Sequence, residues 1–480
     1  MLVDSSILAF FSAATVVVHG LGIAHAAHAV MNVRSSRGAI AWSISLITFP
    51  WLALPLYWIL GRTKFHGYAE ALRSVYRQHY QLVHQTYHEI TKFQVAVSAK
   101  LVPLQLLAEA FTGIPFTSGN NAKLLINGQE TFGAMLSAIA SANSYILLQS
   151  YIIANDQIGN QFKDALIAKA QQGVRIYLLY DEIGSSKLPR SYISSLQKNN
   201  IQVSAFHTTK GRGNRFQLNF RNHRKILVVD GEIAFIGGLN IGDEYLGKHR
   251  RLSPWRDTHL MLQGPTVQSL QSPFLQDWYW ATRKVLDVNW QVKPNQETDF
   301  TALILPTGPA DKLKACKLFF VNAINQAQTR LWIASPYFVP DDSTLTALKL
   351  AAMRGVDVRI ILPNRPDHLF VYLCSFSYYT EMKTMNIKLY RYKHGFMHQK
   401  IILIDHDFAG VGTVNLDNRS FFLNFEVMAF IANSQFAKSV EEMLQADLAA
   451  SVSVDFSEYD RKPLWFNLVV RTSRLLAPLL

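Results

Sequence analysis

The sequence predicts an α/β fold made of two duplicated sandwich domains in a pseudo-twofold arrangement, preceded by a transmembrane helical hairpin. Three observations lead to this prediction. Two charge-free apolar stretches fill most of the first 61 residues, strand and helix patterns alternate from about residue 121, and one motif occurs twice with the same internal spacing. Alternating strand and helix patterns are typical of a sheet covered by helices.

The N-terminal region has the composition of a membrane anchor. Residues 5–33 and 38–61 contain no Asp, Glu, Lys or Arg. Each stretch exceeds the roughly 20 residues that cross a bilayer as a helix. Lipid tolerates Pro50 and Pro55 in the second stretch, and no cationic region precedes the first, as a signal peptide would require. We therefore expect residues 1–62 to form a two-span anchor.

Cations flank the two expected spans. Four cations follow the second span and two lie in the turn between the spans. Because the side with more cations is usually cytoplasmic, and a hairpin returns the chain to the side where it began, this small excess favours a cytoplasmic main domain. The flanking residues are Arg34, Arg37, Arg62, Lys64, Arg73 and Arg77.

The length and net charge of the chain indicate which classes of binding partner to expect. The chain has 480 residues, enough for two or three domains, and a net charge of +13. Such a charge favours nucleic acid or an anionic lipid surface, and the apolar stretches favour lipid. The two cysteines, Cys316 and Cys374, are far apart, which argues against a disulfide scaffold or a cysteine zinc site.

After the anchor, the sequence predicts a connecting segment, two similar halves and a tail. In each half a helix, a strand, a second helix ending at a glycine (Gly173 or Gly355) and another strand follow in the same order. The predicted boundaries are 63–120 for a helical connecting segment, 121–295 and 296–453 for the two domains, and 454–480 for an amphipathic tail.

The repeated motif carries the chemistry. In "RNHRKILVVDGEIAFIGGLN" the residues are His223, Lys225, Asp230 and Asn240. In "MHQKIILIDHDFAGVGTVN" they are His398, Lys400, Asp405 and Asn415. A single His-x-Lys is usually a solvated strand end, but four residue types repeated at three equal spacings indicate a site. In a strand, the histidine and lysine share one face, and Asp230-Gly231 is a hairpin-turn signal.

If the two hairpins meet at the interface of the halves, two histidines, two lysines and two asparagines face one another. Lysines and amides can donate to anionic phosphate oxygens. One histidine can attack phosphorus while the other protonates the leaving oxygen. This prediction requires neither a metal nor a cofactor.

The paired His-x-Lys-x4-Asp motifs, each followed by Gly-(Gly/Thr)-x-Asn, resemble the phospholipase D superfamily. Other segments resemble bacterial cardiolipin synthases more closely. They are the charge-free region up to "FPWLALPLYWILGR", "GGLNIGDEYLG", "WRDTHLMLQGPTVQSLQSPFLQDW", "SPYFVPDD" and "RLLAPLL". Two positions depart from that pattern, Gln399 and Thr413, where smaller residues are usual.

The resemblance implies phospholipase D-like sandwich domains in a bacterial inner-membrane protein. It implies a phosphatidyltransferase that joins two phosphatidylglycerol molecules into cardiolipin and glycerol through a phosphohistidine. His223 is expected to be the nucleophile and His398 the general acid and then base, although the sequence itself does not order them. Lys225, Lys400, Asn240 and Asn415 would hold phosphate oxygens. Asp230, Asp405 and Glu426 would orient a histidine, or the two aspartates would fix the hairpins.

Other readings of the same motifs stay open. Water or another acceptor, such as phosphatidylethanolamine, would make the protein a phospholipase D or a different transferase, and a superfamily nuclease would share the pocket. Anionic phospholipids, not nucleic acid, are the expected partners. Cations near the first motif would face lipid headgroups, namely Lys210, Arg212, Arg215, Arg221, Arg224, Lys248, Arg250 and Arg251.

Overall fold

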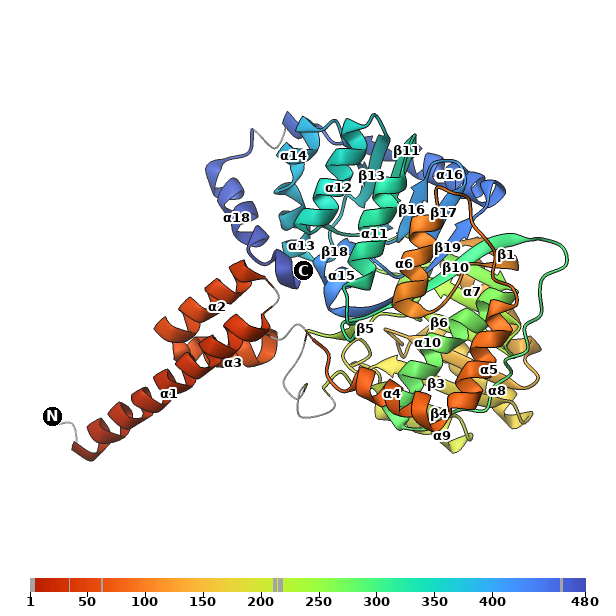
Figure 1. Cartoon of the computed structure of the whole chain (residues 1–480), viewed down its shortest axis with the longest axis horizontal. Helices are drawn as coiled ribbons and strands as arrows, with labels where there is room; N and C mark the ends of the chain where they lie inside the picture. Colours follow the sequence, from red (N-terminus) through yellow and green to blue (C-terminus); the bar gives the residue numbers. More distant parts are fainter. Residues whose placement is uncertain (1–4, 34, 62–63, 210–213, 215–218, 458–460) are drawn as a thin grey trace. The chain divides into compact units, whose positions relative to one another are not determined.

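The computed structural model describes the chain apart from residues 1–4, 34, 62–63, 210–213, 215–218 and 458–460 (Figure 1). The chain divides into two compact units, Met1–Gly67 with Thr208–Phe220, and Tyr68–His207 with Arg221–Leu480. Five of the cations considered above lie outside the described residues, namely Arg34, Arg62, Lys210, Arg212 and Arg215.

The first unit is built on three apolar helices, α1 (Ser5–Asn32), α2 (Ser36–Thr48) and α3 (Pro50–Leu60). Ala29 and Leu46 are fully buried where these helices pack together. Within the described residues, α1 is the one helix whose length and composition would allow it to cross a membrane. This supports a membrane anchor.

The second predicted span does not form one continuous helix, so the expected hairpin stays a prediction. The stretch is divided at Phe49, whose φ of −131° and ψ of 56° are not helical. Pro50 causes the break, because proline has no N–H to donate and its ring disfavours a helical conformation at the residue before it. α2 has 13 residues and α3 has 11, each fewer than the roughly 20 needed to span a bilayer.

Three helices follow before the sheet begins, α4 (Tyr68–Gln78), α5 (Tyr80–Thr91) and α6 (Val102–Thr112). Tyr68 at the start of α4 is buried against the ring of Phe425, at 4.9 Å between centroids. α6 contributes Leu104 to the core of the second half. These helices therefore pack within the second unit.

The first half of the second unit contains two βαβ units. Its elements are β1 (Thr117–Ile126), α7 (Asn127–Ser141), β2 (Tyr145–Ser150), α8 (Gln157–Gln171), β3 (Arg175–Asp181), α9 (Arg190–Lys198), β4 (Gln202–Phe206), β5 (Arg221–Asn222), β6 (Ile226–Val229), β7 (Ile233–Gly237), the 3-10 helix η1 (Asp243–Leu246), β8 (Trp255–Arg256), β9 (Thr258–Gln263) and α10 (Pro265–Thr282). β2 pairs in parallel with β3, and β3 with β4, so α8 and α9 are the crossover helices.

The second half repeats this plan. Its elements are β10 (Phe300–Thr307), α11 (Ala315–Gln326), β11 (Arg330–Ala334), β12 (Phe338–Val339), α12 (Asp342–Met353), β13 (Asp357–Pro363), α13 (Leu369–Phe376), α14 (Tyr379–Thr384), β14 (Lys388–Tyr392), β15 (Phe396–Met397), β16 (Ile401–Ile404), β17 (Phe408–Gly412), β18 (Leu416–Asp417), α15 (Asn418–Phe422), β19 (Asn424–Ala432), α16 (Ser434–Ala449), β20 (Ser451–Ser453), α18 (Leu464–Arg474) and η2 (Ala477–Leu479).

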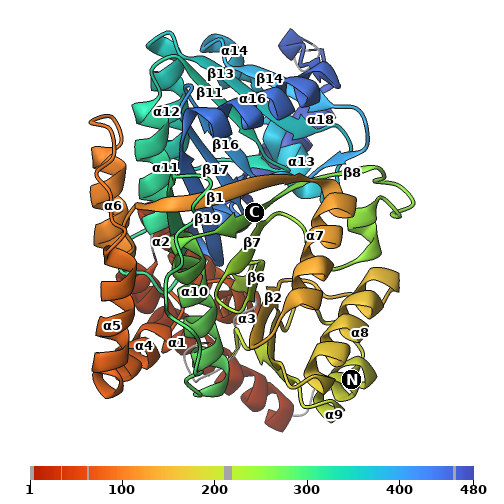
Figure 2. The same ribbon diagram turned by 90° about the vertical axis from the view of Figure 1, so that its right-hand side faces the viewer.

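Strands of both halves join in one sheet whose order repeats outward from its centre. β1 and β10 pair antiparallel in the middle. Outward from β1 lie β9, β7, β6, β2, β3 and β4, and outward from β10 lie β19, β17, β16, β11, β13 and β14. Figure 2 shows β1 between the two halves. The two series correspond strand for strand, as a duplication around a pseudo-twofold axis would produce.

Helices cover both faces of the sheet. On β2, Ile146 is buried in a core that includes Phe132 of α7. The next residue back, Tyr145, points to the other face and donates a hydrogen bond to Gln271 of α10 at 2.7 Å. Alternate residues of this strand therefore bury on opposite faces, and β2 is buried at every position, as the sequence predicts.

The predicted hairpin forms as β6 and β7, with Val229 opposite Ile233. Asp230 has a φ of 55° and Gly231 a φ of 71°. Two consecutive positive φ angles define the type I′ turn that favours Asp-Gly. β16 and β17 form the equivalent hairpin in the second half.

Candidate active site

Two short parallel strand pairs bring each motif histidine against the opposite half. β5 pairs with β19, and the backbone N–H of His223 donates to the carbonyl of Phe425 at 2.9 Å. β15 pairs with β8, and the N–H of His398 donates to the carbonyl of Arg256 at 2.8 Å. Each histidine is thus positioned by the half that does not contain it.

The residue after each of these carbonyls is an acid that holds the histidine ring. Oε2 of Glu426 lies 2.9 Å from Nδ1 of His223, and Oδ2 of Asp257 lies 2.8 Å from Nδ1 of His398. Both acids are fully buried. A carboxylate accepts hydrogen bonds, so Nδ1 carries the proton in each ring and Nε2 keeps its lone pair.

The protonation states suit nucleophilic and acid–base chemistry. Burial lowers the pKa of His223 to about 4, and Lys225 adds to this against the opposing charge of Glu426. Burial also lowers the pKa of His398, and Lys400 acts in the same direction. Both rings are therefore neutral near pH 7, and a neutral imidazole has the lone pair that attack on phosphorus requires.

The two motif lysines are buried beside their histidines. Nζ of Lys225 donates to the carbonyl of His223 at 2.7 Å, and Nζ of Lys400 to that of His398 at 2.5 Å. The ring of Tyr151 contacts both His223 and Lys225, which places these two side chains on one side of the strand. Burial lowers the pKa of Lys400 to about 8 and lowers that of Lys225 well below its ordinary value.

The charge of Lys400 lowers the pKa of Lys225 further and also lowers that of His223. Groups of the two motifs therefore act on one another across the halves, as the sequence predicts for hairpins that meet. Two buried ammonium groups favour an anion between them, and a phosphodiester carries the charge that would offset theirs.

The two motif asparagines are held differently. Oδ1 of Asn240 accepts from the N–H of Ile152 at 3.2 Å, and its Nδ2 donates to the hydroxyl of Tyr245 at 2.5 Å. Asn415 is also buried, but its Oδ1 has no hydrogen-bond partner among the described residues. Its amide retains bonding capacity for a ligand, whereas that of Asn240 is bonded to the protein.

The motif aspartates hydrogen-bond at the far end of the hairpins. A strand rises about 3.3 Å per residue, so seven residues put an aspartate roughly 20 Å from its histidine. The carboxylate of Asp230 accepts from the backbone N–H groups of Asn143, Ser144 and Tyr145. That of Asp405 accepts from those of Gln328, Thr329 and Arg330. These bonds correct the expectation of a catalytic, histidine-orienting role and fit the alternative in which the aspartates fix the hairpins.

The middle residue of each His-x-Lys is anchored to a helix on the outer face. Nη1 of Arg224 pairs with Asp277 of α10 at 3.0 Å. Nε2 of Gln399 donates to Asp447 of α16 at 2.7 Å. Gln399, which departs from the family pattern, thus occupies the place of Arg224 and has an equivalent partner.

Asp257 is the site residue that the sequence reasoning missed. Its counterpart Glu426 was recognised as a candidate, but the two acids do not fall at equal spacings from their asparagines. Asp257 lies 17 residues after Asn240, and Glu426 lies 11 after Asn415. The signal is topological, because Asp257 directly precedes β9, the strand equivalent to the β19 that carries Glu426.

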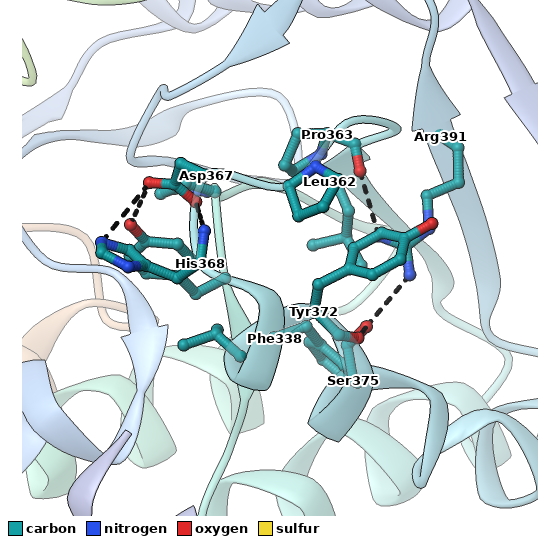
Figure 3. A pocket seen from close by; sticks show the side chains of 12 residues that line it. Phe338, Leu362, Pro363, Asp367, His368, Tyr372, Ser375 and Arg391 are labelled. Carbon is teal, nitrogen blue, oxygen red and sulfur yellow. Dashed lines mark hydrogen bonds and ion pairs between the residues drawn. The ribbon is translucent and has the colours of Figure 1, made fainter. Parts of the chain in front are cut away.

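A pocket of about 260 Å³, including its open mouth, adjoins this centre on the side of the second half. Figure 3 shows its polar groups, with Asp367 and His368 on one side and Arg391 and Ser375 on the other. Asp367 accepts from the hydroxyl of Tyr337 at 2.6 Å. Its charge also raises the pKa of His398, which opposes the effect of burial on that ring.

Among the residues that the structure describes, no group of three or more His, Cys, Asp or Glu side chains is placed to hold a metal ion. The centre contains instead two neutral imidazoles, each oriented by a buried acid, and two buried lysines. This arrangement can supply a nucleophile, a proton carrier and cations for an anionic substrate.

Comparison with known proteins gives consistent results. A family model described as "Cardiolipin synthase, PLD-like domain" matches twice, over residues 135–278 and 320–448. Cardiolipin synthase A of Pseudomonas fluorescens Pf-5 is 43% identical over 467 residues, covering 96% of this chain and 97% of the relative. Cardiolipin synthase A of Pseudomonas aeruginosa is 44% identical over 471 residues, covering 96% and 94%.

Among solved structures, phosphatidylserine synthase of Haemophilus influenzae superposes with a TM-score of 0.60 at 14% identity. The match covers 79% of this chain and 100% of that one. At this identity the likeness concerns the fold alone.

Proposed function

The chain belongs to the cardiolipin synthase family with phospholipase D-like domains, and from this we propose that it is a phosphatidyltransferase that makes cardiolipin from two molecules of phosphatidylglycerol. The main observation behind the proposal is that each histidine is hydrogen-bonded to an acid of the opposite half, His223 to Glu426 and His398 to Asp257. The centre holds two oriented imidazoles and two buried lysines that favour an anion. This arrangement suits a reaction with two successive displacements at phosphorus.

In the first displacement, Nε2 of His223 attacks the phosphorus of one phosphatidylglycerol. A P–N bond forms, the P–O bond to the headgroup glycerol breaks, and the leaving oxygen takes a proton from Nε2 of His398. For this transfer His398 must be doubly protonated when the substrate is bound, although it is neutral in the free protein. The bound phosphodiester adds negative charge and raises the low pKa of His398, so that Nε2 takes up a proton from solvent before the displacement. Glycerol departs and a phosphatidyl-histidine remains.

In the second displacement, a headgroup hydroxyl of another phosphatidylglycerol attacks the same phosphorus. His398, now neutral, takes the hydroxyl proton, and the P–N bond breaks to release His223. One phosphodiester replaces another, so the covalent intermediate conserves the reactivity of the ester and no nucleotide is needed.

The remaining motif residues are proposed to bind the phosphoryl group. Lys225 and Lys400 would donate to its oxygens, since their burial makes an anion more favourable there. Asn415, which is buried in the second motif, would donate from its amide Nδ2 to a phosphoryl oxygen. Asn240 would act from the other motif, although its amide contacts Ile152 and Tyr245 in this structure.

We also propose that the protein lies in the bacterial inner membrane with its catalytic unit in the cytoplasm. The apolar helix α1 supports the membrane anchor, and Lys64, Arg73 and Arg77 after the anchor support the cytoplasmic side for the main domain. A green fluorescent protein fused after residue 480 should fluoresce if the catalytic unit is cytoplasmic. Green fluorescent protein does not fold in the periplasm when it is exported through the general secretory pathway. A dark, protease-sensitive fusion would place the unit outside.

The decisive experiment uses full-length protein with vesicles of phosphatidylglycerol and no added metal, read by lipid mass spectrometry. Cardiolipin and free glycerol in equal amounts are expected, and both should vanish with His223→Ala. Phosphatidic acid in place of cardiolipin would mean that water is the acceptor and would overturn the synthase assignment. Cardiolipin that appears only when phosphatidylethanolamine is added, together with free ethanolamine, would make phosphatidylethanolamine the phosphatidyl donor and keep phosphatidylglycerol as the acceptor.

A further inference from the structure

Helix α18 is amphipathic in an unusual way, because it buries one face and exposes a second apolar one. On the inner face Val470 is fully buried, and Phe466 packs against Phe376 of α13 with ring centroids 5.6 Å apart. Arg474 stacks on the ring of Tyr378 at 4.6 Å and pairs with Glu381 at 3.3 Å. α18 is therefore firmly held by the second half.

The outer face of α18 is apolar and exposed. Leu464 is 87% exposed, Trp465 66%, Leu468 67% and Leu475 79%. Residues at i, i+1, i+4 and i+11 lie along one side of a helix. Soluble proteins seldom leave so many large apolar side chains together in water, so this face has a partner.

α13, against which α18 packs, exposes large apolar side chains of its own. Leu369 is 60% exposed and Phe370 59%. On its other side, the same helix lines the pocket of Figure 3 through Tyr372 and Ser375. One short helix thus separates the exposed apolar surface from the pocket beside His398.

The charges near this surface identify the partner. From residue 463 to residue 480 the chain contains no Asp or Glu, and it carries Arg471 and Arg474. Lys462 precedes the helix, and both Lys462 and Arg471 are exposed. Exposed leucines with a tryptophan and flanking cations are typical of helices that lie in the interface of an anionic bilayer.

We propose that the outer faces of α18 and α13 form a docking surface for the lipid bilayer, separate from the N-terminal anchor. Leucine, tryptophan and phenylalanine side chains enter the acyl–headgroup boundary, and Lys462 and Arg471 contact anionic headgroups. Docking at this surface brings the pocket lined by α13 to the membrane. The lipid substrate would then reach the centre without leaving the bilayer, a consequence that rests on the proposed function.

Photo-cross-linking tests the surface directly. Full-length protein is reconstituted in phosphatidylglycerol vesicles that contain a small share of phosphatidylcholine with a diazirine in its acyl chain. After irradiation, lipid adducts are mapped by peptide mass spectrometry. Adducts on 464–476 and 369–376, besides those on 5–60, are expected. Adducts confined to 5–60 would overturn the proposal, and so would a chain-to-chain dimer that protects α18 from lipid.

A double variant, Trp465→Glu with Leu468→Glu, tests the functional consequence. Its matched control is Leu350→Glu with Met353→Glu, two exposed apolar residues of α12. The α18 variant, Trp465→Glu with Leu468→Glu, should lose the lipid adducts on α18. Its kcat/KM on phosphatidylglycerol vesicles should fall at least about fivefold, because apolar contact drives interfacial binding. The control should do neither, and equal thermal unfolding midpoints would show that both variants fold.

The two proposals fail in different ways. If wild-type protein forms no cardiolipin but is labelled on α18, the docking surface stands and the proposed reaction does not. If cardiolipin forms and the double variant matches its control in adducts and kcat/KM, the reaction stands and the docking surface does not.

Discussion

Glu426 of the second half holds the ring of His223 of the first half, with its Oε2 2.9 Å from Nδ1. Asn424 holds Glu426 in turn, donating from Nδ2 to Oε1 at 3.0 Å. The same relation exists in the opposite direction between Asp257 and His398. Neither half contains a complete histidine–acid pair, so the duplicated halves form one centre and not two.

Replacing Glu426 by glutamine should lower kcat about 100- to 10,000-fold with little change in KM, because the amide can stabilise the wrong tautomer of His223. The carboxylate accepts the Nδ1 proton and so leaves the lone pair on Nε2. A glutamine can donate through its NH₂ and move the proton to the attacking nitrogen. Cardiolipin formation on phosphatidylglycerol vesicles measures the loss.

Glu442→Gln is the control for that variant, because Glu442 is exposed on α16. It should retain wild-type activity. Full activity of Glu426→Gln would show that orientation of His223 does not depend on the carboxylate.

The order of the histidines can be decided with a substrate whose leaving group needs no proton. Phosphatidyl-p-nitrophenol releases a stable phenolate, so His398→Ala should still form the phosphohistidine and release one equivalent of phenolate in a burst. His223→Ala should show no burst. Peptide mass spectrometry should find the phosphatidyl group on His223 in the His398→Ala protein, and the mirror-image result would exchange the two roles.

The pH dependence of this burst follows from the buried groups. Attack needs neutral His223, whose pKa is lowered to about 4 by burial, so the rate should fall as the pH drops toward 4. Binding needs protonated lysines, and burial lowers the pKa of Lys400 to about 8, so the rate should also fall above about pH 8. The measurement uses His398→Ala at subsaturating substrate. A rate that stays level to pH 10 would contradict the buried lysines as phosphate ligands.

Local sequence signals predicted much of this structure. The strand at Ile226–Val229, the Asp-Gly turn and the glycine-ended helices of both halves depend on neighbouring residues, and they form as expected. The repeated spacing predicted that the motifs would act together, because a duplication preserves local geometry in both copies.

What the sequence did not predict depends on contacts between distant segments. Asp257 reaches His398 across 141 positions, and no local pattern marks it because the loop before it differs in length from the loop before Glu426. The break at Phe49 was misjudged for a different reason. Composition predicts that lipid tolerates a proline, but the conformation before Pro50 ended the helix.

The motif aspartates should contribute to stability more than to chemistry. Asp230 accepts three backbone N–H groups at the start of β2, and Asp405 accepts an equivalent set before β11. Asp230→Asn would lose the charge that strengthens its hydrogen bonds to three backbone N–H groups, which should destabilise the fold by about 1–3 kcal/mol. Thermal unfolding in detergent should show a lower midpoint, while the burst rate per folded molecule stays within about tenfold of wild type. Asp164→Asn, at an exposed position of α8, serves as the matched control for removing a carboxylate. An unchanged midpoint with a thousandfold slower burst would contradict a purely structural role. It would show that Asp230, although distant, affects the catalytic function of His223.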